Sequence, residues 1–101
     1  MADQHQVFVT SCAAGEAGAI TAFTLDVATG ALEEINRYTD IENPFFLALS
    51  PDRQVLYSTH VPGDFESDPG YVAALAIGAA GELRKINEQL ANGTTTCYVD
   101  I

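Results

Sequence analysis

The stretch GAITAFTLDVATGALEEIN, residues 18–36, returns as GYVAALAIGAAGELRKIN at residues 70–87, one residue shorter. The leading glycines, Gly18 and Gly70, stand 70 − 18 = 52 positions apart. Segments 44–49 and 96–101 are related by the same offset, 96 − 44 = 52. A repeat of this length is typical of propellers and sheet arrays, in which each unit buries its faces against its neighbours. The sequence therefore predicts two tandem copies of one structural unit.

Most apolar runs in the chain indicate strands. They are short, rich in β-branched or aromatic residues, and separated by Gly, Pro, Asn and Asp, which favour turns. The expected strands are Val7 to Ser11, Ala19 to Leu25, Leu32 to Thr39, Phe45 to Leu49, Val55 to His60, Tyr71 to Ile77, Leu83 to Leu90 and Cys97 to Ile101. The fold class is therefore expected to be all-β.

One segment is ambiguous when it is considered alone. Leu83, Ile86 and Leu90 have helical spacing among good helix formers, which favours a helix over residues 82–90. The equivalent segment of the first copy, residues 32–39, suits an outer strand better. Because equivalent positions of a repeat share one structure, we expect a strand.

The connections between these strands differ in length in a regular way. In an antiparallel meander, successive connections alternate between the two ends of the sheet. The short turns at 26–31, 50–54 and 78–82 would then share one end. The longer connections at 12–18, 40–44, 61–70 and 91–96 would share the other. Long loops on a rigid scaffold commonly carry binding and catalysis, so the long-loop end is the expected working surface.

The composition excludes several classes of partner. The 14 acidic and 4 basic residues give a formal net charge of −10, which repels nucleic-acid backbones and anionic membranes. The first residues have no signal-peptide pattern, and no apolar run approaches membrane-spanning length. We therefore expect a cytoplasmic protein that binds neither nucleic acid nor membrane. Cys12 and Cys97 are too few for a disulfide framework and are expected to be reduced, buried thiols.

These residues also resemble a known family. The resemblance extends over VFVT at 7–10, the first repeat copy, NPFFLALSPD at 43–52, Leu56-Tyr57, GYVAAL at 70–75, GEL at 81–83 and GTTTC at 93–97. In this order the segments are similar to the lactonase family of seven-bladed β-propellers. The resemblance implies about two four-stranded antiparallel blades of a seven-bladed ring. Residues 1–42 would be an incomplete first blade, residues 43–92 the second blade, and residues 93–101 the first strand of a third.

Because a closed propeller needs about four to eight blades, we expect this chain to be an incomplete part of a ring that lacks the remaining blades. The family resemblance implies hydrolysis of a small-molecule sugar lactone, 6-phospho-D-glucono-1,5-lactone, in the pentose phosphate pathway. No cofactor is expected. By itself, a piece of two blades should be inactive, because a propeller site gathers residues from several blades.

Opening a lactone requires a base that activates water and donors that stabilise the oxyanion. His60 is the candidate base and Tyr98 the candidate donor, with Asn43 and Cys97 as candidate substrate-binding residues. Many family members have Asn-Glu where this chain has His60-Val61, and His where it has Tyr98. His60 would otherwise end a strand and bond a loop carbonyl, and Tyr98 would fill space on an inner strand.

Two further functions stay open at this point. A propeller that lacks the family's usual acid and imidazole would be a non-catalytic binding or scaffold protein, and a small self-contained β domain would fold as a monomer. A phosphorylated substrate needs cations to bind its phosphate. The basic residues of this chain are expected to lie away from the long-loop surface: Arg37, Arg53, Arg84 and Lys85.

We also expect no metal. The acidic run at 64–70 resembles a calcium loop, but Leu75 stands where an EF-hand needs a bidentate Glu.

Overall fold

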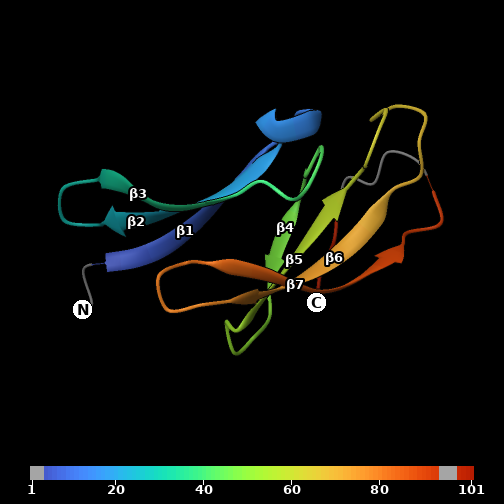
Figure 1. Cartoon of the computed structure of the whole chain (residues 1–101). Coiled ribbons are helices and arrows are strands. Elements are labelled where there is room, and N and C mark those ends of the chain that lie inside the picture. Colours follow the sequence, from blue (N-terminus) through green and yellow to red (C-terminus); the bar gives the residue numbers. More distant parts are fainter. Residues whose placement is uncertain (1–3, 94–97) are drawn as a thin grey trace.

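The computed structural model describes residues 4–93 and 98–101. Its strands are β1 (Gln4–Ser11), β2 (Ala19–Asp26), β3 (Ala31–Tyr38), β4 (Leu47–Leu49), β5 (Val55–His60), β6 (Tyr71–Ile77) and β7 (Leu83–Leu90), and one short helical turn, η1 (Gly15–Ala17), precedes β2. They form a three-stranded sheet, β1-β2-β3, and a four-stranded sheet, β4-β5-β6-β7. Every neighbouring pair is antiparallel. Figure 1 shows the two sheets as separate layers, linked by the segment between β3 and β4. The all-β prediction is confirmed.

Both sheets carry a bulge at the same point of the repeat. The β2–β3 register shifts at Ala22/Phe23, which leaves Ile35 as an extra residue on β3. The β6–β7 register shifts at Ala74/Leu75, which leaves Ile86 as the extra residue on β7. A bulge interrupts the regular alternation of side chains and increases local twist. Since the two copies share even this irregularity, the predicted repeat is confirmed, and residues 83–90 form a strand rather than a helix.

The sheets are held together by an apolar core between them. Ile20, Ile41, Leu56 and Leu75 are buried there, and each such side chain contributes about 1.5–3 kcal/mol on removal from water. Phe8, Tyr38, Leu47, Ile77 and Leu83 pack around this cluster. Neither sheet could bury its apolar face alone, so the folding of each depends on the other.

The connections sort to two ends as predicted. At one end, the Ile77 N–H donates to the Gln54 carbonyl at 3.0 Å, which joins the short turns on either side of β5 and β6. At the other end, the Gly15 N–H donates to Glu42 Oε2 at 2.6 Å, and the Gly70 N–H donates to the Gly93 carbonyl at 2.8 Å. The second end therefore gathers the long loops into one surface.

Two strand predictions need correction. The strand expected over Phe45 to Leu49 is shorter, because only Leu47–Leu49 form β4. The strand expected over Cys97 to Ile101 is not present in residues 98–101, and Cys97 lies outside the described residues. A strand needs a neighbour to satisfy its backbone groups, and no described strand is paired with this segment. Among the described ranges, there is also no helix long and apolar enough to cross a membrane.

Candidate active site

A cleft of about 290 Å³ opens at the long-loop end of the molecule. It is lined by Gly15, Glu16, Thr39, Asp40, Ile41, Glu42, His60, Pro62, Lys85 and Glu88. The first four belong to loops of the first sheet, and the last four belong to β5, the loop that follows it, and β7. The volume is close to the lower bound of roughly 300–1,000 Å³ for small-molecule sites. The predicted working surface therefore contains a cleft between the two sheets.

His60 is the titratable group at the base of this cleft. It is the last residue of β5, and only 5% of its surface is exposed. Its Nε2 lies 3.3 Å from Glu88 Oε1, and its ring lies against Tyr71 with centroids 5.7 Å apart. Neither ring nitrogen makes an aligned hydrogen bond to any described residue. The Glu88 carboxylate is therefore the nearest polar group to the ring among the described residues.

The Glu88 carboxylate contacts both His60 and the Lys85 ammonium. The same Oε1 atom lies 3.2 Å from Lys85 Nζ, so one carboxylate faces an ammonium and an imidazole. The hydrogen bond to Glu88 raises the pKa of Lys85. The expectation that no basic side chain reaches the long-loop surface is therefore wrong for Lys85, which lines the cleft. Its charge is matched by Glu88, and three further carboxylates line the same cleft: Glu16, Asp40 and Glu42.

The charge state of His60 follows from its burial. Burial lowers the pKa of His60 below its ordinary value of 6.5, Lys85 lowers it further, and Glu88 opposes both. The imidazole is therefore neutral at pH 7, as a general base must be.

This pKa predicts a pH-dependent stability. As the pH falls below about 6.5, the unfolded imidazole takes up a proton before the folded one does. Stability is therefore lost over the interval between 6.5 and the lower folded pKa. We expect His60→Gln to reduce this loss in urea unfolding measured from pH 5 to pH 8.

NMR titration of the His60 ring would test the direction in which each neighbouring charge shifts the pKa of His60. Glu88→Gln should lower the midpoint, because it removes the carboxylate that favours the charged ring, and Lys85→Met should raise it. A wild-type midpoint at or above 6.5 would contradict the lowered pKa of His60.

Asn43 lies beside the cleft and has a clear structural role. Its Nδ2 donates to the carbonyls of Val61 and Gly63, each at 2.9 Å, and its backbone N–H donates to the Ala13 carbonyl at 2.9 Å. The residue is 5% exposed. These bonds join three long loops, and both N–H groups of the side-chain amide are used. Only its Oδ1 atom is left for the substrate contact predicted from the sequence.

Tyr98 and His60 are not brought together. Tyr98 is 67% exposed, and its ring packs against Phe46 at a tilt of 44°, with centroids 4.7 Å apart. Neither Tyr98 nor Phe46 is among the residues that line the cleft with His60. Cys97, the fourth predicted site residue, is outside the described residues. The expectation of buried thiols is wrong for Cys12, which is exposed.

Two carboxylates of the acidic loop at 64–70 accept hydrogen bonds from backbone N–H groups of the same loop. Asp68 Oδ2 accepts from the Asp64 N–H at 2.7 Å, and Asp64 Oδ1 accepts from the Glu66 N–H at 3.0 Å. These bonds lower the pKa of Asp64. Within residues 4–93 and 98–101, no group of three or more His, Cys, Asp or Glu side chains is arranged to hold a metal ion.

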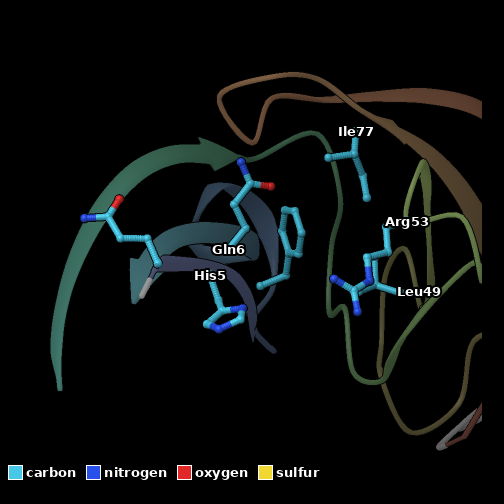
Figure 2. Close-up of a pocket in the computed structure, with 7 residues that line it drawn as sticks. His5, Gln6, Leu49, Arg53 and Ile77 are labelled. Carbon is cyan, nitrogen blue, oxygen red and sulfur yellow. The ribbon is translucent and has the colours of Figure 1, made fainter. Parts of the chain in front are cut away.

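A second cleft between the sheets, of about 450 Å³, lies at the short-turn end. Figure 2 shows His5 and Gln6 approaching it from β1, opposite Leu49, Arg53 and Ile77 of the second sheet. His5 is exposed, and no carboxylate lines this cleft. It lacks the buried base and carboxylate of the long-loop cleft, which is therefore the better candidate site.

Comparison with known proteins finds no match among curated proteins and none among solved structures. A family model does match: that of the lactonase, 7-bladed beta-propeller family, over residues 6–101. The match covers nearly all of the chain and includes both sheets and the long-loop cleft. The paired sheets, their common bulge and this match together place the chain in the lactonase family of seven-bladed β-propellers.

Proposed function

We propose that this chain forms part of a lactone hydrolase of the 6-phosphogluconolactonase type, whose substrate is a sugar lactone. The observation that carries the proposal is His60, a buried neutral imidazole whose Nε2 lies 3.3 Å from Glu88 in a cleft under the long loops. The family match supports lactone chemistry in general. The finer proposal is that the enzyme opens 6-phospho-D-glucono-1,5-lactone in the cytoplasm, as a step of the pentose phosphate pathway.

In this proposal His60 accepts a proton from the water that attacks the lactone carbonyl. A bond forms between the water oxygen and the carbonyl carbon, and the ring C–O bond then breaks. The proton on His60 passes to the departing ring oxygen, which gives the open hydroxy acid. Glu88 stabilises the imidazolium while it exists, because an opposite charge 3.3 Å away favours the protonated ring. General base catalysis of this kind contributes about 10²–10⁴-fold to a rate.

The charges of the cleft bear on where a phosphate could lie. Four carboxylates line it, and Lys85 is already paired with one of them. A phosphate dianion would be repelled here, so we propose that the lactone ring enters this cleft while the phosphate is bound by groups outside it. Further blades around the same channel would supply those groups.

A specific observation favours a second function. The ring nitrogens of His60 are both enclosed, and the candidate donor Tyr98 contacts Phe46 instead of the cleft. A propeller with this arrangement could bind a small molecule or a protein without catalysing its hydrolysis. The two functions differ in whether the lactone opens.

The test is a lactone hydrolysis assay on the product of the whole gene, with phosphorylated and unphosphorylated gluconolactone compared. His60→Gln should lower kcat/KM at least about 100-fold, and Arg84→Gln on the exposed edge of β7 is the matched control that should keep full activity. Faster turnover of the phosphorylated lactone would support the finer proposal. A folded wild-type protein that opens neither lactone above the buffer rate would contradict the hydrolase proposal and support the binding function.

A further inference from the structure

Two side chains of the second sheet meet across an intervening strand at the long-loop cleft. His60 ends β5 and Glu88 belongs to β7, and β6 lies between these two strands. Neighbouring strands of a sheet lie about 4.8 Å apart, so both side chains extend over β6 to reach each other. Their closest atoms, His60 Nε2 and Glu88 Oε1, are 3.3 Å apart. The contact therefore depends on the length of both side chains.

The strand between them leaves room for this contact. Ala73 of β6 pairs with Ser58 of β5 on one side and with Glu88 of β7 on the other. Ala73 and Ser58 are both fully buried, and both have small side chains. Glu88 therefore extends over the Ala73 methyl group toward His60, which pairs with Tyr71 two residues along β6.

The bulge in β7 adds a cation to the same contact. Lys85 pairs with Leu75, and Glu88 pairs with Ala73. Because residues two apart on a strand share a face, Leu75 and Ala73 point to the same side of β6. The extra residue, Ile86, brings Lys85 and Glu88 to that side together, and Lys85 Nζ lies 3.2 Å from the same Oε1 atom. One carboxylate oxygen therefore contacts both an ammonium and an imidazole.

The position of Glu88 bears on which nitrogen of the neutral His60 ring carries the proton. A neutral imidazole has one N–H donor and one acceptor nitrogen, whereas an ionised carboxylate only accepts. With the proton on Nε2, the positive end of the N–H bond faces Oε1. With the proton on Nδ1, the Nε2 lone pair faces that negative oxygen at 3.3 Å. The first arrangement is attractive and the second repulsive, and this difference does not require the alignment of a full hydrogen bond.

Glu88 is the carboxylate that decides between these two forms. Within residues 4–93 and 98–101, no other Asp or Glu forms an ion pair with His60. The loops of the first sheet contribute further carboxylates to the same cleft: Glu16, Asp40 and Glu42. Since the Coulomb energy falls with distance, their effect on the two ring nitrogens is smaller than that of Glu88.

The other ring nitrogen has no competing contact. Nδ1 of His60 makes no hydrogen bond to any described residue. The ring of Tyr71 lies against the imidazole with centroids 5.7 Å apart and an angle of 32° between the planes, which restricts the orientation of the imidazole. The Nδ1 lone pair is therefore the acceptor that the neutral ring has available.

We propose that Glu88 is a positioning residue, which holds His60 in the tautomer protonated at Nε2 and so makes Nδ1 the basic atom. The catalytic part of this inference rests on the proposed lactone hydrolysis. In that reaction Nδ1 takes the proton of the attacking water, and the ring then carries a proton on each nitrogen. The proton on Nδ1 passes to the departing ring oxygen, which restores the original tautomer. Lys85 holds the Glu88 oxygen beside the ring throughout.

The tautomer is measured by ¹⁵N NMR of the product of the whole gene, labelled with [¹⁵N]histidine, at pH 8. Protonated and unprotonated ring nitrogens have well-separated shifts, and His60→Gln identifies the signals of His60. The wild-type ring is expected to be protonated at Nε2. Glu88→Gln removes the charge at constant length, and Glu88→Asp keeps the charge but withdraws it. Each should raise the share of the Nδ1-protonated form at least about threefold. Glu33→Gln, at an exposed position of β3, is the matched control and should leave it unchanged.

A wild-type ring protonated at Nδ1, or a tautomer ratio that neither Glu88 variant changes, would overturn the proposal. Circular dichroism verifies folding, and if one Glu88 variant does not fold, the other decides together with the wild-type spectrum. Gluconolactone hydrolysis tests the catalytic part: Glu88→Gln should lower kcat at least about tenfold and change KM less than about twofold. An unchanged kcat would refute the positioning role. A folded wild type that opens no lactone would instead refute the proposed function, and the NMR result would still decide the tautomer.

Discussion

We expect Asn43→Ala to lower the free energy of unfolding by about 2–4 kcal/mol, which is large for a single substitution. The change removes both donors to the Val61 and Gly63 carbonyls. The Val61 bond is buried, and an unsatisfied buried acceptor costs about 1–3 kcal/mol. Alanine also tolerates a φ of 48° less well than asparagine does. Urea unfolding of the dilute monomer would measure the loss.

The control for Asn43 is Asn92→Ala. Asn92 is exposed and has φ 62°, so it shares the backbone strain but lacks the buried hydrogen bonds. Asn43→Gly removes the strain and retains the loss of the bonds. An Asn43→Ala variant no less stable than Asn92→Ala would show that the junction of the three long loops contributes nothing. In that case, Asn43 would be free for the substrate contact that the sequence predicts.

The second large effect is expected for Gly81→Ala, which should destabilise the chain by about 1–3 kcal/mol more than Gly30→Ala. Both glycines have φ 80°, so both substitutions share the cost of a left-handed backbone. Only at Gly81 would the new methyl group meet the Ala22 Cβ at 2.8 Å and the Ile35 Cδ1 at 3.2 Å. The difference between the two variants therefore isolates the packing of one sheet against the other.

Urea midpoints of the two glycine variants, measured at the same dilute concentration, would decide this prediction. Equal midpoints would mean that the contact between the sheets at the Gly81 turn accommodates the methyl group without cost. A lower midpoint for Gly81→Ala supports a close contact between the sheets.

Much of the fold could be predicted from the sequence because strand alternation, turn residues and repetition are local properties. The repeat at Gly18 and Gly70 was sufficient to predict tandem sheets, and it correctly favoured a strand over residues 83–90. The sorting of short turns and long loops followed from meander topology alone. The strand that repetition predicted over Cys97 to Ile101 is not present in residues 98–101, because a strand forms only beside a partner.

The candidate site was predictable only in part. His60 was found because it ends a strand at the long-loop end and is chemically distinctive. The sequence predicts that Lys85 lies on an outer strand away from the long-loop surface, and it gives no reason to assign Glu88 to the site. On a regular strand, residues three apart point to opposite faces. The extra residue at Ile86 shifts this alternation. Lys85 and Glu88 therefore meet as an ion pair, and the same Glu88 carboxylate lies next to His60.

The sequence by itself determined that this chain is all-β, that it repeats, and which end carries its long loops, since each follows from local pattern and order. Tertiary structure alone decided that His60 is buried and neutral, that Glu88 and Lys85 meet beside it, and that Tyr98 lies elsewhere. The physical reason is that burial and charge proximity depend on how two sheets pack and where a bulge shifts the register. Neither quantity is encoded in the spacing of residues along a single strand.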